Sequence, residues 1–178
     1  MEANELLKQY AAGVRDFTEV NLSEAFLEGA NLSGAILDRA QLDGANLNQA
    51  NLTHASLSQA DLNGASLKNA DLQGANLSGA ILEGAVLDGA MLDSADLSQS
   101  ELVIANLHQA TLSEATLTEA NLSAANLESA DLSGADLAVA DLTQANLSHA
   151  DLNEANLSGA NLEGANLEGT QLDEEQNI

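Results

Sequence analysis

Few residue types in this chain are suited to catalysis or metal binding, and their spacing does not bring them together. Cysteine is absent, which excludes thiolate metal sites and thiol catalysis. The histidines His54, His108 and His149 stand at different positions of a repeat or in distant repeats, so no two are expected to share a metal ion. Serines such as Ser33 and Ser133 have no neighbouring histidine to act as a base. Phosphate-binding loops and zinc-hydrolase motifs are also missing. We therefore predict that the protein is not an enzyme and uses no metal or cofactor.

The dominant feature of the chain is a repeat of five residues. Leucine occupies every fifth position from Leu22 to Leu172, and Phe17 extends this column to 32 pentapeptides over residues 15–174. Alanine stands two residues before nearly every leucine, with Asn or Asp between them, as in Ala30-Asn31-Leu32. A period of five would scatter the leucines around an α-helix and alternate them across a flat strand. The chain must instead turn once per repeat, with leucine and alanine facing inward.

Glycine indicates where the corner of the repeat lies. Of the 13 glycines, 12 stand two residues after a leucine, as Gly34, Gly44 and Gly74 do. A type II turn needs a residue with positive φ, which glycine adopts without steric cost. We hypothesise that corners without glycine use another turn type.

On this motif the sequence resembles the pentapeptide repeat family over about nine-tenths of its length, and its leucine-centred repeats are most similar to cyanobacterial members. The resemblance implies an all-β solenoid, a right-handed quadrilateral β-helix with four pentapeptides per coil and about eight coils. At four repeats per coil, one column of asparagines would form a stacked ladder, made by Asn106, Asn126, Asn146 and Asn166.

The ends of the array differ from its middle. The apolar spacing at residues 4–14 predicts a short helix, with Asn4 as N-cap and Gly13 at its C-terminal end. We expect residues 1–14 to cap the first coil, residues 15–174 to form the β-helix, and residues 175–178 to form a tail without a second helix. A helix that binds a partner is the alternative for the N-terminal segment.

Charge limits the possible partners. The chain has 4 basic and 28 acidic residues, a net charge of −24, and no base after Lys68. This argues against direct binding to nucleic acid or to an anionic membrane. No apolar stretch is long enough to span a bilayer, and the acidic N-terminus does not resemble a signal peptide, so we expect a cytoplasmic protein.

The acidic surface has two interpretations. It either keeps the protein soluble or mimics duplex DNA, as some proteins of the family do towards DNA gyrase. For the second interpretation we single out a stack of acids as the candidate site, made by Asp131, Asp151 and Asp141.

A group of apolar residues interrupts the polar exterior. Ile81, Val86 and Met91 replace Asn or Asp in three consecutive repeats, and Val103 and Ile104 follow one coil later. At four repeats per coil, Ile81 and Val86 would flank the corner beneath Ile104. These residues are either tolerated decoration or a surface for a partner or for self-association. We favour a scaffold that binds an unidentified protein through its outer faces. The alternative is a DNA-mimicking inhibitor or protector of DNA gyrase or another DNA-binding protein.

Overall fold

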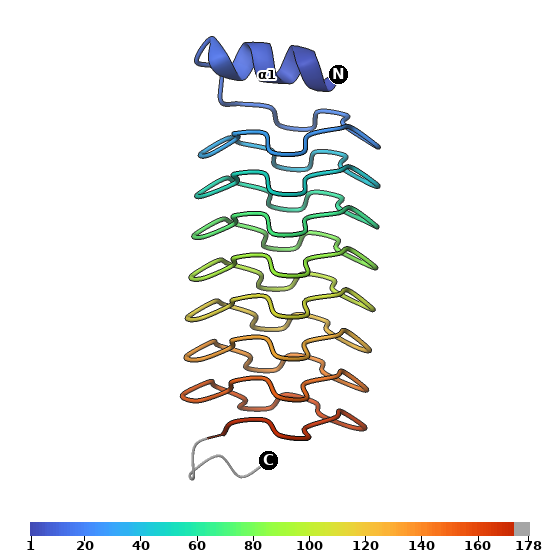
Figure 1. The fold of residues 1–178 in the computed structure, drawn as a ribbon, viewed down its shortest axis with the longest axis vertical. Helices are drawn as coiled ribbons and strands as arrows, with labels where there is room; N and C mark the ends of the chain where they lie inside the picture. The colour runs from blue at the N-terminus through green and yellow to red at the C-terminus, as the bar shows by residue number, and fades with distance from the viewer. Residues whose placement is uncertain (173–178) are drawn as a thin grey trace.

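The computed structural model describes residues 1–172. Within these residues one helix, α1 (Ala3–Ala11), lies across the end of a stack of near-identical coils that the rest of the described chain forms (Figure 1). Within the described residues no regular strand forms; parallel bridges join single residues that are 20 positions apart, such as Asn21 to Gln41. A coil therefore contains four pentapeptides, and its cross-section is a quadrilateral. The expected tail at residues 175–178 lies outside the described residues.

A repeat with Asn or Asp before its leucine uses all five of its backbone amides. In one representative repeat, the amides of Asn46, Leu47 and Gln49 donate to carbonyl oxygens in the neighbouring coils at 2.7 to 2.9 Å. The amide of Ala45 closes the corner by donating to the carbonyl oxygen of the preceding leucine at 3.0 Å. The amide of Asn48 donates to the side-chain Oδ1 of Asn46 at 3.1 Å. Because each donor of such a repeat has a partner, a narrow solenoid of single bridges can replace a conventional sheet.

The core is a column of leucines with alanines between them. The leucines from Leu22 to Leu152 are at most 1% exposed, which confirms the predicted inward orientation of the leucine column. Burial of each leucine contributes roughly 1.5–3 kcal/mol before entropic costs. Ser100 replaces an alanine and is buried as well, and its hydroxyl donates to the carbonyl oxygen of Leu97 at 2.7 Å. In the last described coil, leucines such as Leu157 are only half-buried because no coil of residues 1–172 lies beyond them.

The hypothesis of a different turn at glycine-free corners is wrong. Gln49 and His54 adopt φ values of 57° and 55°, close to the 64° of Gly44. The left-handed conformation is sterically unfavourable for these residues. It persists because the corner amide donates to the next coil, as His54 does to the carbonyl oxygen of Gln73 at 3.0 Å.

The expected helix forms, but its N-cap differs from the prediction. Asn4 lies inside α1, and Glu2, with extended backbone angles, occupies the N-cap position without a side-chain capping bond. Gly13 ends the helix as expected, with φ 96°. The amides of Gly13 and Val14 donate to the carbonyl oxygens of Tyr10 and Gln9, each at 3.0 Å, which is the Schellman arrangement.

Candidate functional site

The outer surface consists of four faces, each built from one pentapeptide per coil. We name them A to D in chain order by their first core residues, which are Phe17, Leu22, Leu27 and Leu32. On each face the residues before and after the core leucine point outward, and the residue two positions after it forms the corner to the next face. Faces B and D are opposite one another.

The acidic candidates contribute to the backbone structure of the coils. Asp131, Asp141 and Asp151 each accept the backbone amide two residues later, at 3.0, 2.9 and 3.0 Å. This is an Asx turn, and asparagine makes the same contact elsewhere. The Thr143 hydroxyl, followed by the Thr143 amide, lowers the pKa of Asp141. The column before leucine therefore holds Asn or Asp because the turn needs a side-chain acceptor.

The structure does not bring the three acids into one stack. Asp131 and Asp151 are bridge partners on face D, so these two are stacked as expected. Asp141 bridges Asn121 and Asn161 on face B, on the opposite side of the solenoid. The predicted stack was wrong for Asp141. Residues share a face only when they are 20 positions apart, and Asp141 is 10 positions, or two faces, away from both Asp131 and Asp151.

Four of the five apolar candidates surround one corner. Ile81 and Val103 lie on face B, Val86 lies on face C, and Ile104 forms the corner between these faces. Ile81 is 41% exposed and Ile104 is 58% exposed. We call these four residues the apolar corner. Met91 belongs to face D and is separated from it.

A corner glycine makes room for Ile104. Gly84 stands one coil earlier in the same corner column, and Ile104 Cδ1 lies 3.9 Å from the place where a Cβ of Gly84 would be. The isoleucine side chain therefore covers the bare backbone of the preceding coil and remains half exposed to solvent.

The apolar corner also interrupts the Asx turns. Isoleucine and valine cannot accept a hydrogen bond, and within residues 1–172 no acceptor contacts the amides of Glu83 and Asp88. At some other positions the loss of the Asx acceptor is compensated, as at Ser58, whose amide donates to Asp38 Oδ1, one coil earlier, at 3.2 Å. At others, such as Asp43 and Asp93, the amide likewise has no acceptor within residues 1–172. The corner thus combines exposed aliphatic side chains with free backbone donors.

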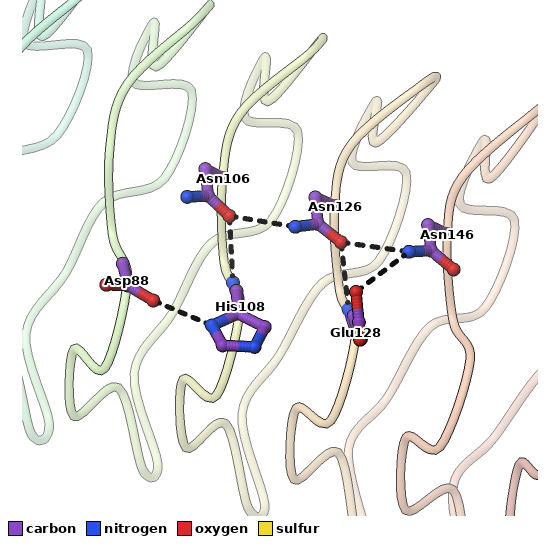
Figure 2. A network of polar contacts seen from close by, with 6 residues as sticks. All are labelled: Asp88, Asn106, His108, Asn126, Glu128 and Asn146. Atoms are coloured by element: carbon purple, nitrogen blue, oxygen red, sulfur yellow. Dashed lines mark hydrogen bonds and ion pairs between the residues drawn. The ribbon is translucent and has the colours of Figure 1, made fainter.

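The predicted asparagine ladder is present on face C, next to the apolar corner. Each Nδ2 donates to the Oδ1 of the preceding asparagine at 3.1 to 3.2 Å, through Asn106, Asn126, Asn146 and Asn166. Figure 2 shows its first three members beside His108, whose Nδ1 lies 2.9 Å from Asp88 Oδ1. We did not predict the His108–Asp88 pair, although both residues follow a leucine and stand 20 positions apart. The pair and the ladder tie neighbouring coils together.

The other two histidines lie at corners. The Nδ1 atoms of His54 and His149 lie 2.5 and 2.4 Å from the positions that a Cβ of Gly74 and of Gly169 would occupy. Each ring therefore covers a glycine of the next coil. Among residues 1–172, no group of three metal-ligating side chains is close enough to hold an ion. In the same part of the chain, no helix has the length and apolar character needed to cross a membrane.

Comparison with known proteins identifies the repeat. A family model described as pentapeptide repeats matches eight copies between residues 16 and 174. The structure of HetL, a pentapeptide repeat protein involved in heterocyst differentiation regulation in the cyanobacterium Nostoc sp. PCC 7120, is 35% identical, with a TM-score of 0.59. The match covers 96% of this chain and 94% of HetL.

A second similar structure is that of QnrB1, a plasmid-mediated fluoroquinolone resistance protein. It is 26% identical, with a TM-score of 0.70, and the match covers 89% of this chain and 83% of QnrB1. None of the curated proteins matches the chain.

Proposed function

This chain belongs to the pentapeptide repeat family, and from that premise we propose that it is a non-enzymatic scaffold that binds another protein through the apolar corner. Proteins of this family fold as right-handed quadrilateral β-helices and are generally structural or protein-binding scaffolds. The 32 repeats of residues 15–174, at four per coil, would make eight coils. Residues 1–14 would act as a cap, and the cytoplasm is the compartment we propose.

The observation that supports this proposal is the clustering of Ile81, Val86, Val103 and Ile104 around one corner, whereas other exposed apolar residues such as Phe26 and Val139 lie elsewhere on the solenoid. Isolated exposed aliphatic residues are ordinary on protein surfaces, whereas contiguous ones tend to mark interfaces. The similarity to HetL, which is involved in a regulatory process, is consistent with a role in binding.

Affinity capture with matched variants tests the proposal. The tagged wild-type protein is compared with a variant that carries Ile81→Ser, Val86→Ser, Val103→Ser and Ile104→Ser, in lysate of the source cells. We expect the captured partner to be lost from this variant and retained by Val139→Ser. Val139 is the matched control because it is a corner aliphatic residue on face A and is 63% exposed. A partner retained by the four-residue variant would contradict the proposed surface.

DNA mimicry is the second candidate function, and the charge distribution favours it. All four basic residues lie within the first 68 positions, so the remaining coils are uniformly negative. The target would be DNA gyrase or another DNA-binding protein. The similarity to QnrB1, a fluoroquinolone resistance protein, gives this candidate a structural precedent.

A further inference from the structure

We propose that the apolar corner recognises a partner segment in which aliphatic or aromatic side chains alternate with lysine or arginine. This inference rests on the proposed scaffold function and specifies the chemistry of the partner. The charges and the unused backbone donors around the four aliphatic residues support it.

Acidic and apolar residues alternate on face B at this corner. Ile81 and Glu83 are the outward residues of one coil, and Glu101 and Val103 are those of the next. Ile81 and Glu101 are bridge partners, so the four side chains form a two-by-two array with aliphatic groups on one diagonal and carboxylates on the other. A segment that lies across this array meets an acid beside each aliphatic group.

Within residues 1–172 no cation pairs with these carboxylates. In the described part of the chain, the contacts between basic and acidic side chains are Arg39–Glu19 and His108–Asp88, and neither includes Glu83 or Glu101. Face B holds no lysine or arginine along residues 1–172; Lys68, on face C, is the cation of the preceding coil. Glu101 accepts one hydrogen bond, from Asn121 Nδ2 at 3.0 Å. Electrostatic complementarity therefore favours a basic partner over an acidic one.

The backbone at the array is also open to a partner. The amides of Glu83 and Val103 have no acceptor within residues 1–172, because Ile81 and Glu101 do not form the Asx turn. In the adjoining coils of face B this donor is used, since the amides of Asn63 and Ser123 each donate to an Asx side chain at 3.1 Å. Two donors without an acceptor in the described chain thus stand beside Ile81 and Val103, where the carbonyl groups of an extended segment can accept from them.

Binding of short synthetic peptides tests the inference. The probe is a fluorescent peptide in which lysine alternates with leucine, isoleucine and phenylalanine, and two comparison peptides replace its lysines by glutamate or its apolar residues by serine. We expect saturable binding of the first peptide only, measured by anisotropy at physiological salt. Ile81→Ser with Ile104→Ser should weaken this binding by about tenfold.

Charge variants test whether the carboxylates of Glu83 and Glu101 attract the lysines of the peptide. Glu83→Gln with Glu101→Gln should weaken binding severalfold and reduce its dependence on salt. The matched controls are Val139→Ser and Glu163→Gln; Glu163 occupies the same column of face B as Glu83. Both controls should bind as the wild type does. Thermal melting of every variant verifies that the fold is retained.

Two results would overturn the inference. One is equal weakening by the corner variants and by their controls, which would indicate adsorption to any acidic surface. The other is a lack of saturable binding by the basic, apolar peptide. If the four-residue variant still loses its partner in affinity capture, this second result removes only the proposed partner chemistry and leaves the scaffold function in place.

Discussion

At the scale of single residues, the corner position shows how stacking overrides local preference. Nineteen residues other than glycine adopt positive φ in the described part of the chain, although this conformation costs on the order of 1 kcal/mol or more at each of them. At some corners glycine is needed for a second reason, because a side chain of the neighbouring coil occupies the space that a Cβ would fill. A Cβ at Gly74 would lie 2.5 Å from His54 Nδ1, whereas a Cβ at Gly64 would have no atom within 4 Å.

This difference predicts unequal costs for the same substitution. Gly64→Ala should lower the free energy of unfolding by about 1–2 kcal/mol, from backbone strain alone, since the φ value is 63° at both glycines. Gly74→Ala should cost more because the ring of His54 must move. When His54 is already replaced by alanine, Gly74→Ala should lower the free energy of unfolding by only as much as Gly64→Ala does in the wild type. Urea unfolding measures all four variants, and equal costs at the two glycines would contradict the steric explanation.

At the scale of elements, the sequence predicted the repeat unit more completely than the arrangement of repeats. The inward leucine column and the asparagine ladder from Asn106 to Asn166 are confirmed. Both follow from fixed spacing. The corner conformation was mispredicted because hydrogen bonds to a residue 19 positions away determine it. The N-cap was misplaced because a short helix leaves its first residue weakly defined by pattern alone.

The candidate site was partly predictable because fixed spacing is visible in the sequence, whereas the position of a repeat within its coil is not. Ile81, Val86, Val103 and Ile104 were recognised as departures from the consensus, and their common corner follows from the four-repeat coil. The grouping of Asp141 with Asp131 failed because the choice of face depends on the position within the coil, which a near-identical pentapeptide does not reveal. The Asx role of these acids was missed, although their spacing of two residues from the amide is visible in the sequence.

The helix α1 packs on the first coil as a cap would. Leu6 is fully buried, and the Tyr10 hydroxyl donates to the carbonyl oxygen of Ser33 at 2.7 Å. The Arg15 guanidinium carbon lies 3.8 Å from the centre of the Tyr10 ring. These contacts support our proposal that residues 1–14 cover the first coil.

Truncation of one side chain tests the cap. Leu6→Ala should destabilise the protein by about 2–3 kcal/mol, because it leaves a cavity between the helix and the first coil. Lys8→Ala is the control, since Lys8 is exposed on the same helix and its loss should change stability by a few tenths of a kcal/mol. Thermal melting compares the two variants. Equal melting temperatures for Leu6→Ala and the wild type would indicate that α1 is not a structural cap.

At the scale of the whole molecule, the charge distribution allows two kinds of partner. The net charge of −24 favours association with any cationic surface, and such association weakens as salt rises. The acids are spread over all four faces, whereas the apolar corner occupies one position. A partner held mainly by burial of Ile81 and Ile104 should show a shallower dependence on salt than a DNA-binding protein held by the acids alone.

Charge removal that keeps the turns intact separates the two functions. In the variant Asp131→Asn, Asp141→Asn, Asp151→Asn, each asparagine retains the acceptor of its Asx turn, so the coils should remain stable while three charges are lost. A DNA mimic would bind its target more weakly after this change, and duplex DNA would compete with it. We expect the opposite: the variant should capture the scaffold partner as the wild type does, because the apolar corner is unchanged.

In a supercoiling assay with purified DNA gyrase, the wild-type protein at micromolar concentration should neither inhibit nor protect the enzyme. Potent inhibition or protection that the three asparagine substitutions weaken would instead assign the acidic faces as the functional surface.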